Sequence, residues 1–145
     1  MMQRLALCLA LLALPSCGEF PRDPEGTLVR VRAERSFSVG VAGGGLDPAA
    51  GALIKRIATV TGAVPRIERG EADPLLTRVE NGELDLVIGR FSATTPWSRL
   101  VTFSPPLQVQ AEKGAEIHLG AAMRNGENAW IGLVEREARD LRAGL

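Results

Sequence analysis

Cysteine is scarce in this sequence, and its positions exclude several kinds of chemistry. The only two cysteines, Cys8 and Cys17, both fall within the first 17 residues. The rest of the chain therefore has no thiol for a disulfide, a nucleophile or a metal site. We expect a domain stabilised by its hydrophobic core alone, and about 128 residues are enough to build one.

The sequence also has no excess of one charge and very little histidine. Acidic and basic residues balance at 17 each, whereas a nucleic-acid partner usually requires a basic patch. His118 is the only histidine, and neither metal-ligand spacing nor a Ser–His–acid arrangement accompanies it. We therefore expect no nucleic-acid partner, metal, cofactor or catalysis, and we assign Glu83 and Asp85 to a turn and a strand start.

Long apolar runs are absent except at the N-terminus. Arg4 precedes a run of Leu and Ala from Leu5 to Leu14, which is shorter than the roughly 20 residues of a membrane-spanning helix. It has the length typical of a signal peptide. The sequence Leu-Pro-Ser-Cys that ends at Cys17 resembles a lipobox, where bacterial lipoproteins are acylated and cleaved. We predict a lipoprotein signal over residues 1–17 and a membrane-anchored periplasmic protein; an ordinary secretory signal is the alternative.

The remaining chain is predicted to hold one α/β domain. Residues 18–34 form a linker and a short leading segment, of which Thr27 to Glu34 fits either an edge strand or a helix. In residues 35–145, strand and helix patterns alternate, which predicts right-handed βαβ units and a mostly parallel sheet flanked by helices. The predicted elements are strands at 36–42, 64–68 and 84–89, helices capped at Asp47-Pro48 and Asp73-Pro74, strand-like segments at 101–109 and 115–123, and a helix at about 127–143.

Glycines and charged residues follow the strands of this predicted sheet. Ligands of open α/β sheets bind beyond the carboxyl ends of the strands, where this chain has Gly43 to Asp47, Glu68 to Glu71, and Gly89 to Ser92. The glycines would let a ligand approach the backbone, although a flexible turn before a capped helix explains them equally. The pattern is not G-x-G-x-x-G, so a dinucleotide site is not predicted.

The stretch from Gly82 to Pro106 resembles the signature of periplasmic amino-acid-binding proteins, the family 3 substrate-binding proteins of ABC transporters. In that family a G-x-x-D turn leads into a central strand, followed by a loop with Ser or Thr, then T-P-E-R and V-x-F-S-x-P-Y. The positions that match are Asp85, Gly89, Ser92, Phe103, Ser104 and Pro106. The resemblance implies that residues 35–145 form a single three-layer lobe, equivalent to the first lobe of the family.

Three departures from the family pattern change what is expected of the ligand. Trp97 occupies the place of the arginine that grips the ligand carboxylate. Glycines replace the aromatic residue after the first strand, and Leu107 replaces a tyrosine. Only a short segment separates Pro106 from the returning strand, so the second lobe is missing. One lobe offers an open platform on which binding is expected to be weak.

The resemblance implies a ligand site and a role in uptake or sensing of a small polar solute, for which an amino-acid-like molecule is one candidate. Hydroxyls and backbone would hydrogen-bond the solute, aromatic faces would stack on it, and arginines would supply charge. The alternatives are that Phe91 is core, Trp97 packs under its loop and Arg99 is a surface residue. A membrane permease or sensor is the implied partner; the competing hypothesis is an interaction or relic lobe that docks another envelope protein. The predicted ligand-binding residues are Gly44, Gly89, Arg90, Phe91, Ser92, Thr94, Trp97 and Arg99.

Overall fold

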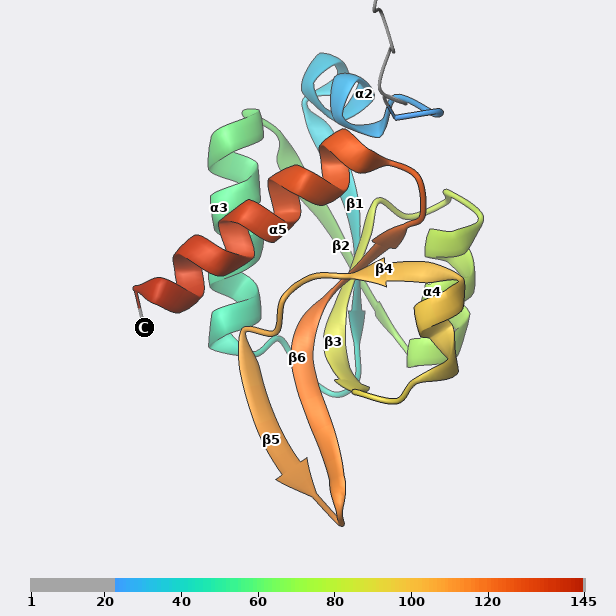
Figure 1. Cartoon of the computed structure of the whole chain (residues 1–145). Helices are drawn as coiled ribbons and strands as arrows, with labels where there is room; N and C mark the ends of the chain where they lie inside the picture. Colours follow the sequence, from blue (N-terminus) through green and yellow to red (C-terminus); the bar gives the residue numbers. More distant parts are fainter. Residues whose placement is uncertain (1–22, 145) are drawn as a thin grey trace, which may run out of the picture.

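Figure 1 shows the computed structural model, which describes residues 23–144. The predicted signal peptide and lipidation at Cys17 lie outside the described residues. Within residues 23–144, no helix is both long and apolar enough to cross a membrane. The described elements are α2 (Thr27–Glu34), β1 (Ser36–Ala42), α3 (Pro48–Thr61), β2 (Val64–Gly70), α4 (Ala72–Glu80), β3 (Leu86–Ser92), the 3-10 helix η2 (Pro96–Arg99), β4 (Val101–Phe103), β5 (Gln108–Glu112), β6 (Ala115–Arg124) and α5 (Asn128–Ala143).

All six described strands belong to one sheet, in the order β2-β1-β3-β6-β4, with β5 also paired to β6. β1 pairs in parallel with both β2 and β3, as predicted. β6 runs antiparallel to β3, β4 and β5, so the sheet is mixed at this end. β5 reverses into β6 through Lys113 and Gly114, whose φ angles of 49° and 82° suit a two-residue type I′ hairpin turn.

Two prolines divide the strand-like segment that the sequence predicted over residues 101–109. Pro105 and Pro106 have no N–H to donate to a strand ladder. The structure accordingly has two short strands, β4 and β5, on either side of the prolines, and both pair with β6. The N–H of Leu107 donates to the carbonyl of Leu119 at 2.8 Å, which holds the edge together immediately after the prolines.

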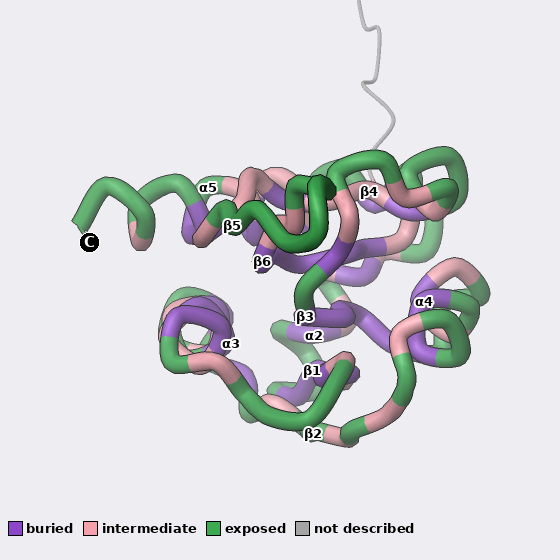
Figure 2. Tube along the Cα trace, turned by 90° about the horizontal axis from the view of Figure 1, so that it is seen from below, coloured by how far each residue is buried: buried purple, intermediate pink, exposed green. Residues whose placement is uncertain are grey.

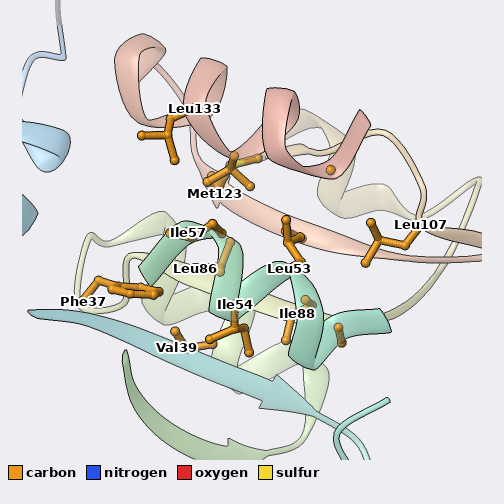
Figure 3. Close-up of a cluster of buried hydrophobic side chains, with 14 of the residues drawn as sticks. Phe37, Val39, Leu53, Ile54, Ile57, Leu86, Ile88, Leu107, Met123 and Leu133 are labelled. Atoms are coloured by element: carbon orange, nitrogen blue, oxygen red, sulfur yellow. The ribbon is translucent and has the colours of Figure 1, made fainter. Parts of the chain in front are cut away.

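Helices cover both faces of the sheet (Figure 2). α3 and α5 pack on one face and form the larger core cluster, whereas α4 packs on the other face over a smaller cluster. Figure 3 shows Leu53, Ile54 and Ile57 of α3 gathered with Phe37 of β1 and Leu133 of α5. The face of α3 that meets the sheet repeats every three or four residues, as expected of an amphipathic helix, and its members are buried: Ala50, Leu53, Ile54, Ile57 and Thr61.

Of the two predicted helix N-caps, one is confirmed and the other is wrong. Asp47 caps α3 as predicted, with its Oδ1 accepting the N–H of Ala49 at 2.9 Å. The predicted cap at Asp73 is wrong: α4 begins at Ala72, and Asp73 lies in its first turn. Its Oδ1 instead accepts the indole N–H of Trp97 at 2.8 Å, a tertiary contact that local sequence does not reveal. Thr27 to Glu34, for which the sequence allowed either a strand or a helix, forms helix α2.

Asp85, at the start of β3, connects four elements through its buried carboxylate and its carbonyl. Oδ2 accepts the N–H and the hydroxyl of Ser38 in β1, at 2.8 and 2.9 Å. Oδ1 forms an ion pair with Arg30 of α2. The carbonyl of Asp85 accepts the indole N–H of Trp130 in α5 at 2.7 Å. The aspartate of the G-x-x-D turn therefore fixes α2 and α5 against the centre of the sheet.

We predict that Asp85→Ala lowers the free energy of unfolding by about 3 kcal/mol. The substitution removes the acceptor of the part-buried N–H of Ser38 and leaves Arg30 with only its longer ion pair to Glu34, and losses of this kind are costly. Urea unfolding followed by circular dichroism measures the effect. Asp140→Ala, an exposed aspartate on α5, is the control and should change stability by less than about 0.5 kcal/mol. Equal effects of the two substitutions would contradict the assignment.

Two carboxylates connect the segment before α2 with the start of α5 by hydrogen bonds to backbone N–H groups. Glu127, which is 1% exposed, accepts the backbone N–H groups of Glu25 and Thr27, both at 2.9 Å. In return, Asp23 accepts the N–H of Ala129 in the first turn of α5. These bonds satisfy N–H groups at the two helix starts that have no partner within their own helices.

We predict that Glu127 makes stability depend on pH. Burial alone would raise the pKa of this carboxyl, but the N–H donors and nearby Arg124 together lower the pKa below its ordinary value of 4.5. The stabilisation is therefore complete above about pH 4.5 and is lost as the pH falls through the folded-state pKa. Glu127→Gln should cost about 1–3 kcal/mol at pH 7, with a difference from wild type that narrows in urea titrations below pH 4.5. A difference that stays constant across the pH range would contradict this linkage.

Candidate ligand-binding site

A pocket of about 340 Å³ lies at the carboxyl ends of β1 and β3, on the α3 face of the sheet. β1 ends at Ala42, and the chain turns through Gly43, whose φ of 88° suits glycine. The N–H of Gly43 donates to the carbonyl of Gly70 at 3.2 Å, so the ends of β1 and β2 form the rim together. The lining residues are Val41, Ala42, Gly43, Gly44, Gly45, Leu46, Asp47, Ala50, Glu71, Ala72, Ile88, Gly89, Arg90 and Leu119.

The two glycines predicted to bind ligand differ in why glycine suits their positions. A methyl group on Gly89 would lie 2.8 Å from the Cβ of Ala42, so glycine is needed there for β3 to approach β1. A methyl group on Gly44 would have no atom within 4 Å. Both glycines line the pocket: Gly89 lets β3 and β1 lie close together, and Gly44 leaves space for a ligand to approach the backbone.

Arg90 is held at the rim of the pocket by groups from two other elements. Its Nη2 donates to Asp47 Oδ2 at 2.8 Å, while the other oxygen of Asp47 caps α3. Its Nη1 donates to the side-chain carbonyl of Gln110 at 3.0 Å, and Nη2 lies 3.4 Å from that of Gln108. With Glu71 also lining the pocket, the site presents one guanidinium and two carboxylates to a ligand.

Phe91 and Ser92 do not share this pocket. Neighbouring residues on a strand point to opposite faces, and Phe91 packs into the core on the α4 side with its ring centroid 5.1 Å from that of Phe103. Phe91 and Ser92 instead line a separate cavity of about 210 Å³ with Ser104 and His118. The core interpretation of Phe91 agrees with its burial.

The remaining predicted residues line neither of these two cavities. The hydroxyl of Thr94 is 3.1 Å from that of Ser92 in the loop after β3. Trp97 is half-buried against α4 and the smaller core cluster, and Arg99 is exposed, with its carbonyl accepting the side-chain N–H of Asn125 at 3.4 Å. Of the predicted ligand residues, Gly44, Gly89 and Arg90 alone line the pocket beside α3: the others do not.

Some other residues of the site could be predicted from the sequence and others could not. Glu71 directly follows β2, and its position at the carboxyl end of a strand placed it at this edge in advance. Leu119 comes from antiparallel β6, opposite Arg90. Gln110, which contacts Arg90 but does not line the pocket, comes from the hairpin strand β5. Their places depend on strand register, for which the sequence carries no local signal. Within residues 23–144, no group of three or more His, Cys, Asp or Glu side chains is arranged to hold a metal ion.

Comparison with known proteins finds likeness in structure alone. No family model and no curated protein matches the sequence. The arginine-bound form of domain 1 from TmArgBP, the ArgBP of T. maritima, is 19% identical with a TM-score of 0.64, over 77% of this chain and 97% of that one. An ancestral cationic amino acid solute-binding protein, AncCDT-1, is 12% identical with a TM-score of 0.67, over 81% and 94%; it is also described as a precursor of cyclohexadienyl dehydratase.

An amino acid ABC transporter substrate-binding protein from Streptococcus pneumoniae, bound to L-arginine, is 11% identical with a TM-score of 0.66, over 81% of this chain and 92% of that one. Identities this low establish the fold and no more. The described domain therefore has the fold of one lobe of the periplasmic amino-acid-binding proteins, with α3 and α5 on one face of a mixed sheet and α4 on the other.

Proposed function

We propose that this chain binds a small polar solute in the pocket beside α3, as the substrate-binding component of a transporter or sensor. The observation that carries the proposal is the charge arrangement around an open, glycine-lined pocket. Arg90 pairs with Asp47 at the rim, and Glu71 also lines the pocket. A ligand carboxylate can replace Asp47 on Arg90, and a ligand cation can then pair with the released Asp47 or with Glu71. A molecule with both charges, such as an amino acid, suits this arrangement.

The single lobe sets the strength of binding that we expect. A closing second lobe excludes water and supplies contacts on the far side of a ligand. Here the pocket is formed from one side, and the ligand must compete with the existing bond between Arg90 and Asp47. Affinity should therefore be modest. Because the structural neighbours include arginine-bound proteins, L-arginine is the first ligand to test.

We predict that a bound solute stabilises the domain through Arg90. Thermal unfolding of Gly18–Leu145, which contains both core clusters, is measured against amino acids, polyamines, sugars and small anions. A ligand at 100 times its Kd adds about 2.7 kcal/mol to the unfolding free energy. Arg90→Ala should abolish that gain, whereas Arg99→Ala, another exposed arginine away from the pocket, should keep it. A shift that survives Arg90→Ala would exclude this site, and no shift with any compound would favour a docking or relic lobe.

We also propose that the chain is an envelope lipoprotein acylated on Cys17. The support is the apolar run from Leu5 to Leu14 and the Leu-Pro-Ser-Cys sequence that follows Ala13. A domain that starts a few residues later would then be held in the periplasm close to a membrane. Lipidation would keep a weak, open receptor at high local concentration beside a permease or sensor.

We predict that a labelled fatty acid is incorporated into the full chain expressed in bacteria, and that Cys17→Ser abolishes incorporation. Cys8→Ser is the matched control, because Cys8 lies inside the apolar run and not at the predicted cleavage site. Autoradiography of membrane fractions measures the label. Labelling that persists in Cys17→Ser, or that is absent from the wild type, would contradict the proposal.

A further inference from the structure

The β5–β6 hairpin extends beyond the rest of the sheet (Figure 1). β3 pairs with β6 as far as Ser92 and Ile117, and the N–H of Ala93 then donates to the carbonyl of Glu116 at 2.9 Å. Beyond Glu116 the backbones of the two hairpin strands pair only with each other. Residues 109–116 are all exposed. A two-stranded ribbon without a packed face is marginally stable in water. This hairpin is therefore a feature that a partner would stabilise.

The outer edge of β5 is open to strand pairing, whereas the opposite edge of the sheet is protected. β2 forms that opposite edge and carries Pro65, Arg66 and Arg69, residue types that prevent pairing with another chain. β5 has the sequence Gln-Val-Gln-Ala-Glu, with no proline and no basic residue. No described strand lies on its outer side, so alternate backbone N–H and C=O groups face solvent there.

We propose that two copies of this chain pair through β5, antiparallel and centred on Gln110, and that each copy completes the rim of the other's pocket. In this register Gln110 faces its own equivalent, Val109 faces the partner's Ala111, and Gln108 faces the partner's Glu112. No like charges oppose each other. Because the hairpin extends beyond the sheet, this antiparallel pairing places the two bodies at opposite ends of the shared ribbon.

Charge complementarity supports this register. Gln108 and Gln110 lie on one face of β5, since Arg90 donates to both of their side chains. Directly opposed residues of an antiparallel pair point to the same face. The partner's Glu112, opposite Gln108, therefore approaches Arg90 at the pocket rim, and the twofold symmetry repeats this contact. The inference rests on the proposed function only in assigning the pocket beside Arg90 to a ligand.

Cysteine cross-linking tests the register in the domain from Gly18 to Leu145, which has no native cysteine. Gln110→Cys places two thiols directly opposite each other, where Cβ atoms of paired strands lie close to disulfide spacing. Oxidation should convert most of this variant into a covalent dimer. Ile67→Cys is the control, an exposed position on the protected edge strand β2, and should stay monomeric. No cross-link at Gln110, or equal cross-linking at both positions, overturns the proposal.

Sedimentation equilibrium of the unmodified domain provides the second measurement. We expect a concentration-dependent dimer, and Gln110→Lys should raise its Kd at least about tenfold by opposing two like charges. Ile67→Lys should not change the Kd. A domain that is monomeric at every concentration overturns the dimer, while ligand stabilisation in that monomer would still support the proposed function. A dimer that no solute stabilises would support the pairing and contradict the solute receptor.

Discussion

Buried Asp85 joins α2, β1, β3 and α5 through its carboxylate and its backbone carbonyl. It accepts two bonds from Ser38 and pairs with Arg30, and the adjoining carbonyl accepts the indole N–H of Trp130. Removing a buried carboxylate from water is costly unless its oxygens are satisfied. The four elements must therefore meet in this one arrangement. It also fixes where β3 starts, and so where Gly89 and Arg90 meet the pocket.

Local signals predicted the parts of the fold that depend on neighbouring residues. The cap at Asp47 and the buried face of α3 follow from helix chemistry within one segment, and β1 follows from its composition. Asp73 has the same local pattern as Asp47, yet the indole of Trp97, 24 residues away, takes its carboxylate. Pro105 and Pro106 have no N–H to donate to a strand ladder, so the break between β4 and β5 could have been predicted from the sequence.

Only the site residues that lie at the carboxyl ends of the parallel strands could be predicted from the sequence. Gly44, Gly89 and Arg90 line the pocket because carboxyl ends of parallel strands meet at one edge. Phe91 follows Arg90 directly, so strand alternation alone assigns it to the other face. The partners of Arg90 on β5 could not be predicted, because they depend on the register of an antiparallel hairpin. A resemblance in sequence motif thus located the edge of the sheet but not the full set of side chains.

The mutual capping of Asp23 and Glu127 has a consequence for how the domain is oriented. It attaches the first described residues at the end of β6 that lies beside the amino ends of the parallel strands. The pocket opens at their carboxyl ends, on the opposite pole. Any surface that held the chain by its N-terminal segment would therefore adjoin the back of the domain. Solute would enter and leave on the far side, without passing the point of attachment.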